Sequence, residues 1–322
     1  MVKQEQANRL DLDALLKELQ QEEQQPIDFR SGFVAVVGQP NVGKSTLINR
    51  LVGQKVAIVS PKAQTTRRRI LGILTTEKSQ IIFVDTPGIH KAHHKLGEYM
   101  NVHALGAIPD ADVVLFIVQA NREPNELDDE IARKVNRFVG PKILLINKID
   151  LVEQEVATAR YESYQQLGKW DLVLLISALE GHGVEAVCDT IIENLPLGPR
   201  YYPDGQVTDQ TERVIVAEMI REVALHHLMQ EVPHSLNVEV RDWKKRRNGM
   251  IYIEAIIYVE RKGQKRIVIG TKGQMLKEIS TKARLEIERE LGKRIYLELW
   301  VKVRDKWRNS ENWLRRWGYK PE

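Results

Sequence analysis

Apolar and polar positions follow two regimes along this chain. Over residues 32–195, short β-branched runs alternate with stretches in which apolar residues recur every three or four positions. That alternation is typical of helical crossovers packed on a mostly parallel sheet, with ligand loops at the carboxyl ends of the strands. The pattern predicts an α/β domain with a doubly wound sheet.

The same pattern gives expected element bounds. Runs 71–74 and 81–84 are close together, which predicts a hairpin and one antiparallel edge strand. We expect strands at 33–37, 69–74, 80–84, 113–119, 143–147 and 172–177. We expect helices directly after residue 45 and at 96–107, 125–138, 156–167 and 184–194.

Chain breakers between residues 195 and 205 mark a boundary, after which an α+β pattern begins. We expect a helix at 213–228, strands at 235–241 and 250–259 joined by a basic turn at 244–249, a helix at 274–291 and a strand at 296–303. The predicted organisation is an extension at 1–28, a first domain at 29–197, a linker at 198–212 and a second domain at 213–322. The extension carries a leucine stripe, and we expect a flexible segment there, with a short docking helix as the alternative.

The first expected strand runs directly into G-x-x-x-x-G-K-S, followed by a helix. In that context, glycines let consecutive N–H groups face a polyphosphate at a helix N-terminus. Lys44 is expected to reach the outer phosphates, and Ser45 to ligate Mg²⁺. The residues expected to bind the phosphates are Gly38, Gln39, Pro40, Asn41, Val42, Gly43, Lys44, Ser45 and Thr46.

Two later strand ends indicate which base is bound. Asn147-Lys148-x-Asp150 ends one strand, and a carboxylate at Asp150 can accept two hydrogen bonds from guanine but not from adenine. The Lys148 stem can cover the ring, and Asn147 can tie this loop to the phosphate loop. Ser177 and Ala178 end the next strand and supply a backbone amide for the guanine oxygen.

The strand at 80–84 delivers Asp85, Thr86, Pro87 and Gly88. Asp85 is expected to hold Mg²⁺ through water, and the Gly88 N–H to sense the γ-phosphate. Upstream, a threonine of K-A-Q-T-T-R can close over Mg²⁺ when GTP is bound. Thr65 and Thr66 are both candidates, and we favour Thr66. Lys44, Thr66 and Gly88 are the expected catalytic residues.

Ras-like GTPases place a glutamine after Asp-x-x-Gly, whereas this chain has Ile89, which cannot orient water by hydrogen bonding. Another group, a partner or a monovalent cation must therefore supply transition-state charge. The site resembles that of GTPases with a hydrophobic residue at this position, and in those proteins the Asn41 position accompanies stimulation by K⁺. We therefore expect slow hydrolysis that is faster in K⁺ than in Na⁺. His90, His93 and His94 follow, but without a nearby thiolate or carboxylate a zinc site is the weaker interpretation.

The charge is uneven: residues 205–322 hold 25 Lys and Arg against 17 Asp and Glu, a net +8, whereas the whole chain is +4. A polyanionic partner is expected there. One cysteine excludes a disulfide framework, and no run of eighteen apolar residues or signal-like N-terminus is seen, so we expect a cytosolic protein.

A glycine pair in this basic half indicates RNA binding. The G-x-x-G loop precedes a helix, an arrangement that lets a single-stranded backbone pass close while a lysine meets its phosphates. The order of elements, α-β-β-(G-x-x-G)-α-β, predicts a type II KH domain. Ile267, Ile269, Met275 and Ile279 are expected to line the base platform; Trp313 and Trp317 suit packing at least as well as stacking. The expected RNA contacts are Ile269, Gly270, Thr271, Lys272, Gly273 and Lys277.

The set G-Q-P-N-V-G-K-S-T-L, K-A-Q-T-T-R, D-T-P-G, N-K-I-D and I-S-A, followed by V-I-G-T-K-G and L-E-L-W-V-K-V, resembles the bacterial Era GTPase family over nearly the whole chain. The resemblance implies GTP and GDP with Mg²⁺ as ligands and small ribosomal subunit assembly as the role. The KH-like domain would hold the 3′ end of the small-subunit ribosomal RNA. A cytoplasmic monomer with peripheral association with the inner face of the plasma membrane is also implied.

Two other functions remain open from the residues alone. One is a regulatory GTPase whose basic domain docks on acidic lipids, which does not require the G-x-x-G loop. The other is a small-molecule phosphotransferase, which does not require Asp150.

Overall fold

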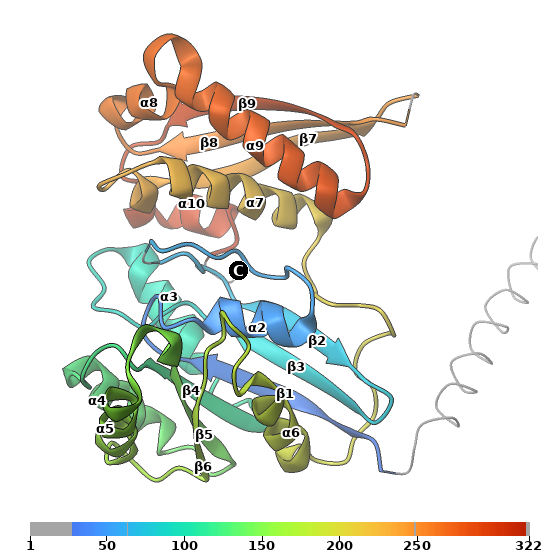
Figure 1. Ribbon diagram of the computed structural model, residues 1–322. Coiled ribbons are helices and arrows are strands. Elements are labelled where there is room, and N and C mark those ends of the chain that lie inside the picture. The colour runs from blue at the N-terminus through green and yellow to red at the C-terminus, as the bar shows by residue number, and fades with distance from the viewer. Residues whose placement is uncertain (1–27, 63, 248, 320–322) are drawn as a thin grey trace, which may run out of the picture.

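The computed structural model describes residues 28–62, 64–247 and 249–319, which form two sheets, each covered by helices (Figure 1). The leucine stripe predicted in the extension lies outside the described residues. Within those ranges, no helix is long and apolar enough to cross a bilayer.

In the described part of the chain, the larger sheet has six strands in the order β2-β3-β1-β4-β5-β6. β2 pairs antiparallel with β3, which confirms the predicted hairpin, and the other neighbours pair in parallel. The order reverses beside β1, the place where open α/β sheets bind ligands. The strands are β1 (Arg30–Val37), β2 (Ile70–Thr75), β3 (Ser79–Asp85), β4 (Val113–Gln119), β5 (Lys142–Asn147) and β6 (Leu172–Leu175).

Helices cover both faces of this sheet (Figure 1). Apolar side chains of α2 and α6 form one core with one face, and those of α3, α4 and α5 contribute to a second core on the other. The strands are therefore buried from both sides, which explains their continuous apolar runs. The helices are α2 (Lys44–Val52), α3 (Lys95–Gly106), α4 (Glu126–Val135), α5 (Gln154–Gln165) and α6 (Val184–Asn194), with a 3₁₀ turn η1 (Ile149–Leu151).

The second sheet has the order β7-β8-β9, with β7 and β8 antiparallel and β8 and β9 parallel. Helices α7 and α9 pack on one face and share a core with the inward residues of all three strands. The elements are α7 (Glu212–His227), η2 (Pro233–Ser235), β7 (Asn237–Lys245), β8 (Ile251–Val259), α8 (Lys262–Ile269), η3 (Thr271–Gly273), α9 (Gln274–Leu291), β9 (Ile295–Val303), η4 (Trp307–Asn309) and α10 (Glu311–Arg316).

Helix α8 corrects the expected order, which had no helix before the G-x-x-G loop. Its run of β-branched residues favours a strand in isolation. The Gln264 side chain, however, accepts hydrogen bonds from the N–H groups of Glu260 and Arg261, 3.0 and 2.9 Å away, which caps the helix start. Val268 is fully buried, so tertiary packing overrides the local preference.

Residues 195–211, between α6 and α7, run along the first sheet. Gln80 Oε1 accepts the N–H groups of Tyr201 and Tyr202, and the Ile73 N–H donates to the Val207 carbonyl. This connection is therefore fastened to the larger sheet along its length.

Candidate functional site

The loop after β1 adopts a backbone that only certain residues allow. Gly43 has φ 105° and precedes the first residue of α2, and Gly38 has φ 154°. A Cβ on Gly43 would lie 2.1 Å from Asn147 Nδ2, so the loop also depends on a close approach. The N-terminus of α2 therefore begins directly at this tight turn.

Lys44 lies buried beneath this loop, with 6% of its surface exposed. Its Nζ donates to the carbonyl oxygens of Gly38 at 3.2 Å and Gln39 at 2.9 Å. Burial lowers the pKa of Lys44 to about 8, and the nearby Asp85 carboxylate opposes that shift. The ammonium is therefore held by weak carbonyl partners that phosphate oxygens can replace.

Three oxygen ligands meet beside Lys44. Ser45 Oγ donates to Asp85 Oδ2 at 2.8 Å and lies 3.0 Å from Thr66 Oγ1, which is itself 3.3 Å from Asp85 Oδ2. Burial raises the pKa of Asp85 to about 6, against the lowering effect of Lys44. Asp85 Oδ1 is buried without a hydrogen-bond partner. A hard, all-oxygen cluster with an orphaned carboxylate oxygen fits Mg²⁺ with bound water.

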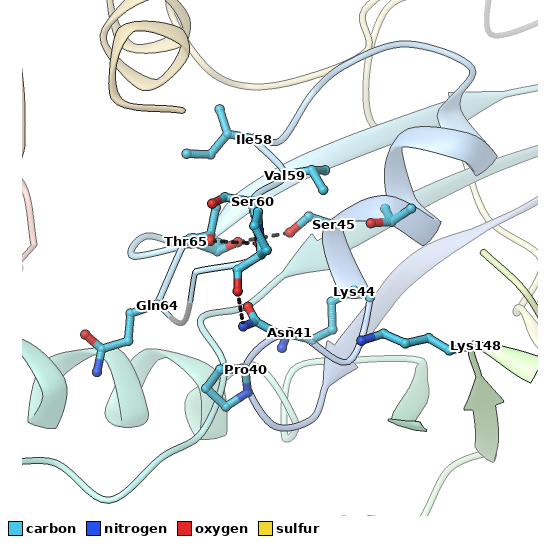
Figure 2. A pocket seen from close by; sticks show the side chains of 15 residues that line it. Pro40, Asn41, Lys44, Ser45, Ile58, Val59, Ser60, Gln64, Thr65 and Lys148 are labelled. Atoms are coloured by element: carbon cyan, nitrogen blue, oxygen red, sulfur yellow. Dashed lines mark hydrogen bonds between the residues drawn. The ribbon is translucent and has the colours of Figure 1, made fainter. Parts of the chain in front are cut away.

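A cavity of about 390 Å³ opens above these groups (Figure 2). Its lining includes P-loop residues together with Thr66, Gly88 and Lys148, which the sequence analysis had singled out. It also includes residues that sequence reasoning did not single out: Ile58, Val59, Ser60, Pro61 and Gln64. The one sequence signal for these residues is that they directly precede the Thr-Thr-Arg element.

The predicted base loop is assembled at the ends of β5 and β6. Asn147 Nδ2 donates to the Val42 carbonyl at 2.7 Å, which ties this loop to the P-loop as expected. Lys148 Nζ donates to Gln119 Oε1 at 2.9 Å, and burial lowers the pKa of Lys148. Asp150 Oδ1 accepts the Ser177 hydroxyl at 2.5 Å. This bond orients the Asp150 carboxylate.

Some expected binding residues present only their backbone. The Val42 side chain is buried in the core, and the Thr86 hydroxyl donates to the Val36 carbonyl at 2.7 Å. Gly88 passes so close to the P-loop that a Cβ would lie 2.5 Å from the Pro40 nitrogen. Ile89 is buried, so its side chain offers nothing to an attacking water.

The G-x-x-G loop joins α8 to α9. Gly270 has φ 74° and ψ 175°, and Lys272 and Gly273 also have positive φ. A shallow pocket of about 280 Å³ opens beside it, lined by Gly273, Lys277 and Leu299 of β9 together with Leu276, Ser280 and Thr281. Ile267 and Met275 remain accessible, but Ile279 is fully buried in the core. Its expected place on the base platform is wrong because it faces inward from α9.

Comparisons with known proteins agree with this geometry. A family model described as a 50S ribosome-binding GTPase matches residues 33–148, and a KH domain model matches residues 231–308. The chain is 50% identical over 297 residues to GTPase Era of Carboxydothermus hydrogenoformans, covering 91% of this chain and 99% of that one. Era of Ruminiclostridium cellulolyticum is 46% identical over 294 residues, with the same coverage.

The chain belongs to the Era family of GTPases.

Two solved Era structures resemble it at a TM-score of 0.88 and 39% identity, covering 91% of this chain and all of the other. One is Era of Aquifex aeolicus bound to GDP and AlF₄⁻; the other is Era in complex with MgGDPNP and nucleotides 1506–1542 of 16S ribosomal RNA. This Era-family protein is therefore a GTP-hydrolysing enzyme with a P-loop GTPase domain followed by a KH domain.

In this Era-family chain, the KH domain packs directly on the segment after Gly88. Leu96 and Met100 of α3 share a cluster with Tyr258, Trp307 and Trp317. Trp307 is fully buried, and its Nε1 donates to the Ser235 carbonyl at 2.8 Å. The tryptophans at 307 and 317 are therefore packing residues of the domain interface, and neither is open to stack on RNA.

The histidines after Ile89 have structural roles in the same region. His90 Nδ1 lies 2.8 Å from the Gly88 carbonyl oxygen, and His94 Nδ1 accepts the Gly97 N–H at 3.0 Å, capping α3. Burial, more than the nearby Arg308 and Arg67, lowers the pKa of His94 to about 4. The neutral ring is the form that can cap the helix.

Proposed function

We propose that the Era-family activity of this chain is carried by the residues assembled around the 390 Å³ cavity. Backbone amides of residues 38–46 would hold the phosphates, and Lys44 would exchange its carbonyl partners for outer phosphate oxygens. Ser45, Thr66 and Asp85 would hold Mg²⁺, which supplies charge neutralisation to the leaving phosphates when bound. The Gly88 N–H would meet the γ-phosphate, and Thr86 and Pro87 would set its loop.

The base assignment in this proposal rests on Asp150, whose side chain is oriented by the Ser177 hydroxyl. Guanine offers two adjacent donors to that carboxylate. The Ala178 N–H, which donates to Asn147 Oδ1 at 2.9 Å, would exchange that partner for the guanine oxygen. Lys148 would cover the ring. GTP and GDP are therefore the proposed nucleotides.

Hydrolysis on this site is proposed to be slow without a further cation. Ile89 is buried and carries no hydrogen-bonding group, so the chain itself presents no residue there to orient water. Asn41 has φ 61°, and its Nδ2 donates to the Pro61 carbonyl at 2.9 Å, which holds the P-loop against the cavity wall. We place a K⁺ contact at this position.

The second domain is proposed to bind the 3′ end of the small-subunit ribosomal RNA as a single strand and to assist assembly of that subunit. The observation that carries this proposal is the pocket between α9 and β9, where Gly273 and Lys277 lie beside the apolar Leu276 and Leu299. The likeness to the Era complex with a 16S ribosomal RNA segment supports the choice of RNA. Ile269, Thr271 and Lys272 would contact the strand beside the two glycines.

The proposed domain bounds are 29–197 and 213–322, joined by the linker 198–212. The packing of α3 on Trp307 and Trp317 gives a physical route by which GTP state and RNA affinity influence each other, and such coupling is reciprocal. The family resemblance also leads us to propose a cytoplasmic monomer with peripheral association with the inner face of the plasma membrane.

The test is RNA binding by the full chain, measured by anisotropy of a labelled oligonucleotide with the 3′ sequence of small-subunit ribosomal RNA. Lys272→Ala and Lys277→Ala should each weaken binding several-fold and lower its salt dependence. Lys282→Ala is the matched control, because Lys282 is exposed on α9 outside both the G-x-x-G loop and the pocket lining. Equal binding by all four proteins would contradict the RNA assignment, and retained attachment to vesicles of phosphatidylglycerol alone would favour lipid docking.

A further inference from the structure

Helix α7 of the KH domain reaches into the GTPase domain at the segment that contains Thr66. We call residues 55–62 and 64–68 the switch I segment. Glu222 Oε1 accepts the Val59 N–H at 2.9 Å, and its second carboxylate oxygen pairs with Lys55 Nζ. Arg221 donates through Nη2 to the Thr65 carbonyl oxygen. Arg221 is fully buried and Glu222 is 5% exposed, so water competes little for these bonds.

A second set of contacts holds the other side of Thr66. The Arg67 guanidinium donates to the carbonyl oxygens of His234, at 3.0 Å, and Leu236. Thr66 thus lies between two neighbours that are each bonded to the KH domain, while its own Oγ1 lies 3.0 Å from Ser45 Oγ. Ile58, at the start of the same segment, is buried in the KH-domain core.

These contacts fix the backbone on which Thr66 depends. Moving the segment would separate the buried Glu222 carboxylate from Lys55 and would leave Arg221 Nη2 without the Thr65 carbonyl oxygen, and a buried polar group that loses its partner is costly. Arg221 is itself held in place, since its Nε donates to Glu218 Oε1 at 3.0 Å one turn earlier on α7. The Arg221 guanidinium is therefore oriented toward the Thr65 carbonyl oxygen by its bond to Glu218.

We propose that Arg221 and Glu222 are positioning residues for the GTP form. By holding the switch I main chain from the KH domain, they prealign Thr66 for the Mg²⁺ that accompanies GTP, and so set the preference for GTP over GDP. The inference rests on the proposed role of Thr66 as a Mg²⁺ ligand. By thermodynamic reciprocity, a ligand that stabilises the contacts of α7 with the switch I segment also raises the affinity for GTP.

The experiment compares the affinities of the full chain for a fluorescent non-hydrolysable GTP analogue and for fluorescent GDP in Mg²⁺. Arg221→Met and Glu222→Gln should each lower the affinity for the GTP analogue about tenfold or more. The affinity for GDP should fall less than about twofold, because only the GTP form uses Thr66. Arg221→Lys keeps a donor and should recover part of the loss. Arg213→Met, an exposed arginine at the start of α7, is the matched control and should change neither affinity.

The readout separates positioning from general stability. A substitution that only loosens the fold would weaken both nucleotides alike, so an equal loss overturns the inference, as does no loss at all. Thr66→Ala distinguishes the remaining cases. If it leaves the GTP to GDP ratio unchanged, the proposed Mg²⁺ ligand and the route through it are both wrong. If it lowers the ratio while Arg221→Met does not, the site assignment stands and the positioning role is overturned.

Discussion

Asn147 and Val42 are joined by a hydrogen bond of 2.7 Å from the Asn147 side chain to the Val42 carbonyl. The same side chain accepts the Ala178 N–H at 2.9 Å through its oxygen. One amide therefore connects the loops after β1, β5 and β6, which come from widely separated parts of the chain. Their relative placement depends on a residue that need not touch the nucleotide.

Asn147→Ala should lower the affinities for GTP and GDP equally, by about tenfold or more. The reason is that a buried carbonyl and a buried N–H lose their hydrogen-bond partners, at a free-energy cost of about 1–3 kcal/mol each. Titration calorimetry with both nucleotides is the measurement. Asn194→Ala is a suitable control, since that side chain bonds only within α6. A loss confined to GTP would argue against this bridging role.

Asp150→Asn should change the base preference. An amide can donate to the oxygen that xanthine carries in place of the guanine 2-amino group, so affinity should fall for GTP and rise for xanthosine triphosphate. Competition binding measures the exchange, with the exposed Asp189→Asn as control. Unchanged selectivity for GTP would refute the reading of Asp150.

Gly270→Asp should abolish RNA binding while leaving hydrolysis in the absence of RNA close to the original rate. Gly270 occupies φ 74° and ψ 175°, which side chains avoid, and a Cβ there would lie 2.6 Å from the Met275 Cβ. Filter binding and phosphate release are the two assays. Gly263→Asp adds the same charge where a Cβ meets nothing within 4 Å, and it should retain most RNA binding.

Hydrolysis should run faster in K⁺ than in Na⁺ at equal ionic strength, because the site lacks a hydrogen-bonding residue at position 89 and needs added positive charge in the transition state. Asn41→Ala should reduce that difference. Phosphate release in the two salts measures it. Equal rates in the original protein would remove the monovalent cation from the mechanism.

Stability should fall as the pH drops from about 6.5 towards 4, in part through His94. The pKa of this ring is lowered from 6.5 to about 4, so the unfolded chain takes up a proton in that window and the folded chain does not. His94→Asn keeps a capping acceptor that does not titrate, and it should lose less stability between pH 7 and pH 5 in urea unfolding. The exposed His182→Asn should behave like the unsubstituted protein.

Elements whose signals are local could be predicted from the order of the residues alone. The P-loop and the loops at Asp85 and Asn147 follow from motifs placed at the ends of apolar runs, because backbone conformation and periodicity depend on neighbouring residues. The bounds of β4, α6 and α9 agree with those expected. The G-x-x-G loop was found in the same way.

Contacts between residues far apart in the chain are defined by the folded protein. Helix α8 forms because Val268 is buried and Gln264 caps its start, against the local strand preference of its sequence. Trp307 and Trp317 are interface residues because they pack against α3. Ile279 faces the core and is fully buried. Arg221 has no signal in its own neighbourhood that links it to Thr65, 156 positions away. Such contacts are set by how two folded domains meet, and no pattern along one segment carries that information.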